Sequence, residues 1–175
     1  MLVFVYLDDI LLLAKSKTLA QKQTETMLRD LTESGMMINA KKSQTEPTQQ
    51  VEHLGFQLDL KKGVLQVPTQ KLKAVRKELG KFLIQQEMSC RKAAAILGQL
   101  RSFLTALPCL RAFSDHLVKF TENQRWSRWD QKHVIPESLK DQVREIGALL
   151  KTWEGRSFGG RSQVREIYSE SSTQG

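Results

Sequence analysis

Hydrophobic positions recur with two different periods along the chain. Between residues 50 and 67 apolar and polar residues alternate, which predicts strands, and beyond Pro68 the period changes to about 3.6, which predicts amphipathic helices. An almost unbroken apolar run, Leu2–Leu13, opens the chain and carries Asp8 and Asp9 at its centre. This run predicts two short buried strands joined by a tight turn at Tyr6–Asp9.

Further elements follow this run up to residue 67. A Thr-x-x-Gln capping box at Thr18 and Gln21 predicts a helix over 18–34, with Gly35 as its stop. We expect a strand at 36–38, a basic turn at 39–43 and a hairpin from Val51 to Val67. In that hairpin Leu54, Phe56, Leu58 and Leu60 share one side of a strand, Lys61-Lys62-Gly63 turns the chain, and Gly55 indicates a close backbone approach or a bulge.

Beyond Pro68 the apolar residues have the spacing of helices. Thr69, Ser89 and Pro108 are predicted to start three helices, and Pro136-Glu137 a fourth that ends before Gly155. The expected apolar stripes comprise Leu72, Val75, Leu79, Phe82 and Leu83; Ala93, Ile96, Leu97, Leu100, Phe103 and Leu104; Leu110, Phe113, Leu117 and Phe120; and Leu139, Val143, Ile146, Leu150 and Trp153. Residues 155–164 are typical of a linker. The predicted fold class is α+β: antiparallel hairpins with a packed helix, followed by a helical bundle.

Composition narrows the class of protein. The chain has 175 residues, 40% hydrophobic and 26% charged, as in a soluble globular protein of one domain or two small ones. The longest apolar run is too short to span a bilayer, and no basic stretch precedes it as a secretion signal requires. We therefore expect an intracellular protein, cytoplasmic or nuclear, without a membrane partner. Cys90 and Cys109 have no metal-ligand spacing and predict neither a zinc site nor a disulfide framework.

Positive charge is concentrated in the middle of the chain. The formal net charge is +8, and residues 68–130 hold 12 basic and 5 acidic side chains, an excess of 12 − 5 = +7. Such clustering is the electrostatic footprint of a polyanion partner, although a solvated face is an equally good interpretation. The basic residues that fall largely off the apolar stripes are Lys71, Lys73, Arg76, Lys77, Lys81, Arg91, Lys92 and Arg101. Two tryptophans within 125–130 could stack on bases, but packing between modules is the favoured interpretation.

The carboxylate pair is the strongest candidate for chemistry. Two adjacent negative charges in an apolar run are costly unless a cation lies between them. Magnesium is the natural candidate, because it takes one or two carboxylates together with substrate phosphates and can work in pairs on an in-line displacement. The alternative is a hairpin whose tip simply faces solvent.

An aromatic-x-Asp-Asp sequence on a hydrophobic hairpin resembles the catalytic motif of reverse transcriptases. The resemblance extends over residues 1–120, with matching pieces in the family's order. These pieces are Tyr6–Asp9, the helix over 18–34, Ile38–Lys42, His53–Phe56, and the helices from 69 onward, including Ala95–Leu100.

The resemblance implies a role for each matching residue. Asp8 and Asp9 would hold two Mg²⁺ ions, Tyr6 would lie beneath the primer end, and Lys41 or Lys42 would stand near the departing pyrophosphate unless both belong to a solvated turn. The primer strand would be held by His53, Leu54, Gly55 and Phe56, and the charged thumb would hold duplex phosphates through Lys73, Arg76 and Lys77. The implied partners are an RNA or DNA template with its primer and deoxynucleoside triphosphates.

The same resemblance implies a division of the chain. Residues 1–67 would be the C-terminal part of a polymerase palm, 68–122 a helical thumb, 123–163 a connection, and 164–175 the start of a ribonuclease H-like domain, with Glu170 where that family has Asp. This order is similar to that of DIRS-like and related long-repeat retrotransposons. Because the family needs a further Asp and nucleotide-binding residues from upstream, we expect a fragment of an RNA-directed DNA polymerase that is inactive alone. The alternative is a non-enzymatic nucleic-acid-binding remnant of a decayed element.

Overall fold

The structure is a computed structural model that describes residues 1–122 and 129–158. It consists of helices and antiparallel strands, so the α+β prediction is confirmed. The strands are β1 (Leu2–Tyr6), β2 (Asp9–Leu13), β3 (Gln50–His53), β4 (Phe56–Asp59), β5 (Val64–Gln66), β6 (Glu87–Ser89), β7 (Lys132–Val134) and β8 (Arg156–Ser157). The helices are α1 (Lys17–Glu33), α2 (Thr69–Ile84), α3 (Cys90–Arg101), the 3₁₀ helix η1 (Pro108–Ser114), α4 (Asp115–Glu122) and α5 (Glu137–Thr152).

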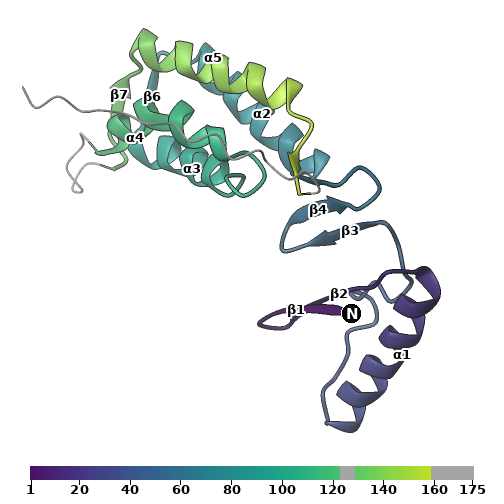
Figure 1. Ribbon diagram of the computed structural model, residues 1–175. Coiled ribbons are helices and arrows are strands. Elements are labelled where there is room, and N and C mark those ends of the chain that lie inside the picture. Colours follow the sequence, from purple (N-terminus) through teal and green to yellow (C-terminus); the bar gives the residue numbers. More distant parts are fainter. Residues whose placement is uncertain (123–128, 159–175) are drawn as a thin grey trace, which may run out of the picture.

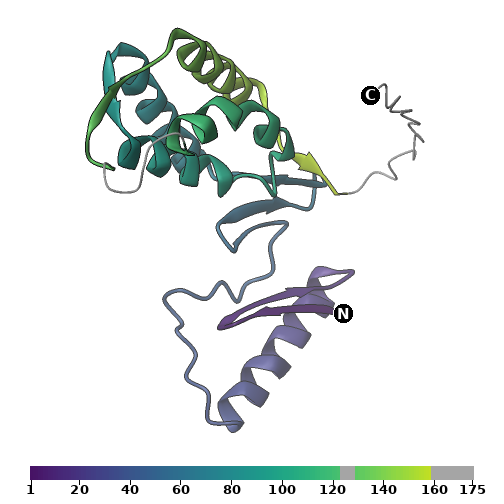
Figure 2. The ribbon, with the colours of Figure 1, turned by 90° about the vertical axis from the view of Figure 1, so that its left-hand side faces the viewer.

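The strands form three small sheets. β1 pairs with β2, β6 pairs with β7, and a four-stranded sheet has the order β3-β4-β5-β8. In Figure 1 this third sheet lies between the helical bundle above and the β1–β2 hairpin with α1 below. Figure 2 shows β8 returning from the bundle to the edge of this sheet, where Leu65 pairs with Arg156. Residues 156–157 are therefore a strand, although the sequence predicted a linker there.

One apolar core holds the helical bundle together. Its buried side chains run from Val67 to Leu150 and come mostly from α2, α3, η1, α4 and α5, with Met88 from β6 and a few from the connecting segments. The stripe predicted for the last helix is confirmed, because Leu139, Val143, Ile146 and Leu150 are all buried. The Trp153 indole then donates to the Ala106 carbonyl, at 3.0 Å. Helix α5 shares this core with α2 and α4, and the boundary expected between 122 and 123 stays a prediction.

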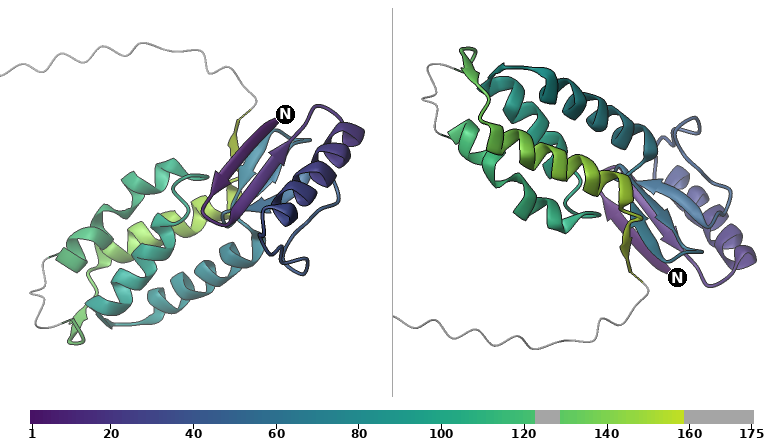
Figure 3. Two further views of the ribbon diagram at one scale, coloured as in Figure 1. Left: turned by 90° about the horizontal axis from the view of Figure 1, so that it is seen from below. Right: turned by 90° about the horizontal axis from the view of Figure 1, so that it is seen from above.

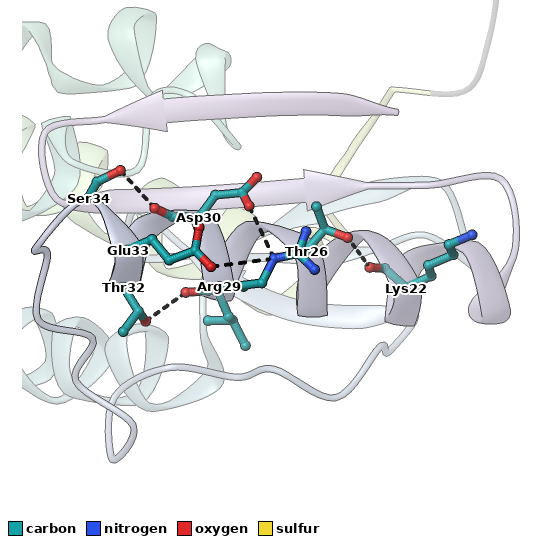
Figure 4. A network of polar contacts seen from close by, with 8 residues as sticks. Lys22, Thr26, Arg29, Asp30, Thr32, Glu33 and Ser34 are labelled. Carbon is teal, nitrogen blue, oxygen red and sulfur yellow. Dashed lines mark hydrogen bonds and ion pairs between the residues drawn. The ribbon is translucent and has the colours of Figure 1, made fainter.

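Helix α1 borders the β1–β2 hairpin and has a polar outer face. Its N-cap is Ser16, whose hydroxyl accepts from the Leu19 N–H at 3.3 Å, so the capping box predicted at Thr18 is wrong. Gly35, with φ of 82°, follows its end as predicted. Figure 4 shows Thr26, Thr32 and Ser34 donating to carbonyls one turn earlier, and Arg29 beside Asp30 and Glu33. Figure 3 shows α1 running alongside the hairpin.

Three other predictions differ from the structure. Residues 36–38 form no strand, since a strand needs a pairing partner and the described residues supply none there. The helix expected from Pro108 is divided into η1 and α4, because the Gln142 side chain accepts from the His116 and Leu117 N–H groups and so caps a new helix. The strands of the first hairpin are not buried: β1 is exposed along its length and β2 is at most half-buried.

Candidate active site and nucleic-acid interface

The carboxylate pair lies at the tip of the β1–β2 hairpin. Tyr6 pairs with Asp9, so Leu7 and Asp8 are the two central residues of the turn, and the turn predicted at Tyr6–Asp9 is confirmed. Leu7 has φ of 50° and is 84% exposed. A positive φ at the first central residue suits a two-residue hairpin turn that normally places glycine there. A leucine in this conformation is strained, and such strain concentrates at functional sites.

Both carboxylates are open to solvent. Asp8 and Asp9 are exposed, and neither side-chain carboxylate has a hydrogen bond or an ion pair among the described residues. The burial cost that motivated the magnesium prediction is therefore not incurred in this chain. Their hard oxygen donors do fit Mg²⁺. Within residues 1–122 and 129–158, however, no group of three His, Cys, Asp or Glu side chains could hold an ion. A two-ion site would need ligands beyond this pair.

Lys41 and Lys42 lie in a separate turn, which confirms the basic turn predicted at 39–43. The Asn39 carbonyl accepts from the N–H groups of Lys42 and Ser43, both at 3.0 Å, and both lysine side chains are exposed. In the part of the chain that the structure describes, no hydrogen bond or ion pair joins either lysine to Asp8 or Asp9. Their part in catalysis stays a prediction.

The second candidate motif, His53–Phe56, is a turn rather than the middle of a strand. His53 pairs with Phe56, and the two residues between them have positive φ, 50° for Leu54 and 77° for Gly55. Two left-handed residues in succession are the signature of a type I′ hairpin turn. Leu54, 45% exposed, is at the tip, His53 is half-buried, and Phe56 packs against the core of the bundle.

Lys71 reaches this turn from helix α2. Its ammonium donates to the Gly55 carbonyl at 2.9 Å, and a Cβ added to Gly55 would lie 2.4 Å from Lys71 Nζ. The close approach predicted at Gly55 therefore exists, and the approaching group is a lysine side chain. Sequence reasoning could not pair two residues 16 positions apart on different elements.

A buried carboxylate near this motif has a structural role. Asp59 accepts from the Lys62 N–H at 2.9 Å and from the Gln50 side-chain amide at 2.8 Å. The Lys62 N–H holds the pKa of this carboxyl below its usual range, and burial opposes that shift only in part. Asp59 thus fixes the turn that ends at Gly63, where φ is 68°. The sequence signal was an Asp at the start of a turn.

The eight basic residues expected on one surface divide into two groups. Four are already engaged within the chain: Lys71 with Gly55, Arg76 with Leu150, Lys81 with Glu78, and Arg91 with Asp130. The other four, exposed and without a hydrogen bond or ion pair among the described residues, are Lys73, Lys77, Lys92 and Arg101. The hydrogen bond from Lys81 is the main cause that lowers the pKa of Glu78, and the charges of Lys77 and Lys92 lower it further. Lys92 on α3 is therefore close enough to α2 to interact electrostatically with Glu78.

Arg76 departs from the expected exposed position. It is half-buried, and its guanidinium donates to the Leu150 carbonyl near the end of α5, while its Nε is buried without a partner in the part of the chain described. A cation at a helix C-terminus is favourable, because carbonyl groups there lack partners within the helix. Arg76 therefore joins α2 to α5, whereas Lys73 and Lys77 remain available to a partner.

Some predictions fall outside the described residues. These are the segment 123–128 with Trp126, and the ribonuclease H-like start at 164–175 with Glu170. Next to the first of these, Arg91 makes a two-pronged contact with Asp130, 2.6 Å from Nε and 3.0 Å from Nη2. The Arg91 N–H also donates to the Trp129 carbonyl, so Arg91 is part of the attachment of this connection to α3.

The fold and this site define an α+β protein with a strained Asp-Asp hairpin, a second glycine-containing hairpin and a helical bundle. Residues 1–58, about a third of the chain, match the family model described as reverse transcriptase (RNA-dependent DNA polymerase). The match supports the interpretation of the chain as a reverse transcriptase fragment. No curated protein and no solved structure matches the chain. No helix in the described residues is long and apolar enough to cross a membrane.

Proposed function

We propose that this chain is a fragment of an RNA-directed DNA polymerase and that the β1–β2 hairpin carries part of its catalytic site. The observation behind this proposal is the turn itself. Two exposed carboxylates, without a partner among the described residues, follow a strained Leu7 on an apolar hairpin, and the hairpin lies in the segment that matches the reverse transcriptase family. A turn with no function would be expected to place glycine where Leu7 stands.

The proposed reaction is template-directed nucleotidyl transfer. The primer 3′ oxygen attacks the α-phosphorus of a deoxynucleoside triphosphate, a P–O bond forms, and pyrophosphate leaves. Asp8 and Asp9 would hold two Mg²⁺ ions, which supply positive charge to the phosphates. Tyr6 would support the primer end, and Lys41 or Lys42 would face the departing pyrophosphate. Since one carboxylate pair cannot position two ions, the chain should need an acidic residue from another palm segment.

The remaining elements supply the proposed nucleic-acid contacts. Residues 1–67 would belong to the palm and 68–122 to the thumb, with 123–163 as a connection and 164–175 opening a ribonuclease H-like domain. His53–Phe56 would hold the primer, and the exposed lysines of α2 the duplex phosphates. A DIRS-like or related long-repeat retrotransposon, acting in the cytoplasm or nucleus, is the proposed source.

A primer-extension assay with magnesium tests the proposal. The chain alone should not extend a primer, whereas the chain joined to an upstream palm and fingers segment of a reverse transcriptase should. Asp8→Asn in the joined protein should abolish extension, and Lys132→Met, an exposed change on β7, should not. Extension by the chain alone, or by the joined Asp8→Asn protein, would contradict the assignment of Asp8.

A second candidate function is nucleic-acid binding without catalysis. It is favoured by the four basic side chains on α2 and α3 that have no partner among the described residues: Lys73, Lys77, Lys92 and Arg101. Under this alternative the chain binds duplex with an affinity that falls steeply with salt, yet the joined protein never extends a primer.

A further inference from the structure

We propose that Lys71 binds a backbone phosphate of the nucleic acid at the β3–β4 turn, bridging that phosphate to the Gly55 carbonyl. The inference rests on the proposed function, because that function supplies the strand. It adds a binding residue to the turn. The expected reason for the glycine at position 55 was a sugar-phosphate backbone packed directly against it. The reason is instead the approach of the Lys71 side chain.

The geometry of the contact supports this role. Lys71 lies in the first turn of α2 and extends to a turn 16 residues earlier, where its ammonium is 2.9 Å from the Gly55 carbonyl oxygen. The same nitrogen occupies the position beside Gly55 that a Cβ would need. The cation therefore forms part of the surface of the turn, and a strand that reached Gly55 would meet Lys71 first.

The hydrogen bonding of this ammonium is incomplete. A lysine ammonium has three donors, and Gly55 is the one acceptor for Lys71 among the described residues. The side chain is exposed, so the other donors face solvent. A carbonyl carries no net charge and leaves the positive charge of Lys71 uncompensated. A phosphate oxygen would supply both the second acceptor and the opposite charge.

The electrostatic setting of Lys71 also favours an anion. A cation in the first turn of a helix lies at the positive end of the helix dipole, which is unfavourable by itself. The first turn of α2 contains no acidic residue, and its N-cap, Pro68, makes no side-chain capping bond. Lys71, which has no ion pair among the described residues, thus places positive charge between the Leu54–Gly55 turn and the start of α2. A phosphodiester, with one negative charge, is the partner that this arrangement suits.

The alternative is that Lys71 only ties the turn to the helix. Both roles use the same hydrogen bond, so a loss of affinity in Lys71→Met would not by itself distinguish them. A change in the ligand can distinguish them, because a neutral methylphosphonate linkage removes the charge of a single phosphate. If Lys71 contacts that phosphate, the methylphosphonate and Lys71→Met together should weaken binding no more than either change alone.

The experiment measures duplex binding by fluorescence anisotropy, using the full chain and a primer–template whose primer carries one methylphosphonate at successive positions. For the unchanged protein, several positions should weaken binding, and the position that Lys71 contacts should weaken it by about three- to tenfold at 0.1 M salt, the effect of one phosphate contact. In Lys71→Met the same position should have no further effect, and the slope of log affinity against log salt should fall by about one. Lys71→Arg should restore the sensitivity.

Lys132→Met is the matched control, because Lys132 is also exposed but lies on β7 at the far end of α2 in Figure 1. It should keep the full methylphosphonate pattern. Unchanged melting temperatures would confirm that every variant folds. Salt-dependent binding in which Lys71→Met retains the whole pattern would overturn the role of Lys71 and leave the proposed function standing. Absence of duplex binding by the unchanged chain would overturn both.

Discussion

Replacing Arg76 by methionine should destabilise the helical bundle more than it weakens nucleic-acid binding. The substitution keeps the aliphatic stem of the side chain and removes the guanidinium that donates to the Leu150 carbonyl. Leu150 is 1% exposed, so water reaches this carbonyl poorly once its partner has gone. The contact also places a positive charge near the C-terminus of α5, which is favourable for the helix.

The size of the effect follows from the loss of one hydrogen bond with a charged donor. Such bonds contribute about 1.5–3 kcal/mol to the free energy of unfolding. For a chain of this length each kcal/mol shifts the melting temperature by about 2–4 °C, so Arg76→Met should lower it by roughly 3–12 °C. Lys73→Met, on the same helix but exposed and without a partner among the described residues, should leave it within about 2 °C.

Two measurements on each variant check this reasoning: thermal unfolding by circular dichroism, and duplex affinity at several salt concentrations. Lys73→Met should reduce the salt slope, while Arg76→Met should reduce the melting temperature and leave the slope of the folded protein unchanged. The contrary result is that Arg76→Met has the melting temperature of the unchanged protein and loses duplex affinity as Lys73→Met does. In that case Arg76 would be a phosphate ligand, and its role in joining α2 to α5 would be wrong.

Three further outcomes are expected. Asp8→Asn should melt at the same temperature or slightly higher, because it removes one of two neighbouring charges; a loss of about 1 kcal/mol or more would indicate a structural cap instead. Gln142→Ala should cost about 1–2 kcal/mol by uncapping α4, whereas Gln142→Glu keeps an acceptor and should cost less, as denaturant titration can measure. The pKa of Asp59 is lowered by folding, so its stabilising contribution is complete above about pH 4 and is lost as the pH falls through its folded value. Melting temperatures between pH 2 and pH 7 should therefore depend less on pH in Asp59→Asn than in the unchanged chain.

Local patterns predicted the elements that depend on local physics. Helix α5 is one of them, because its start at Pro136 and its buried positions at Leu139, Val143 and Ile146 all follow from spacing within the helix itself. The β1–β2 hairpin is another, since an apolar run interrupted by polar residues must turn. Its burial could not be predicted, because burial depends on what covers a strand and not on the strand alone.

The predictions that were wrong depend on contacts between residues far apart in the sequence or on rare backbone conformations. The break before α4 depends on Gln142, 26 residues from the N–H of His116 that it caps. The turn at Leu54 was assigned to a strand because a leucine with positive φ is uncommon and leaves the alternation of apolar residues intact. Among the site residues, Lys71 and Arg76 could not be distinguished from Lys73 by charge or helical position. Their partners, Gly55 and Leu150, belong to other elements.

The uneven distribution of buried side chains has a consequence for amide hydrogen exchange. No side chain in residues 1–58 is buried, whereas the core from Val67 to Leu150 contains large side chains that are almost fully enclosed. Backbone hydrogens in the bundle should therefore exchange only on global opening, while those of β1, β2 and α1 should exchange within a much shorter time through local opening. Protection of the first hairpin would then rise when a partner segment covers it. The same measurement that ranks the stability of the two parts would thus report when a partner segment covers the Asp8–Asp9 turn.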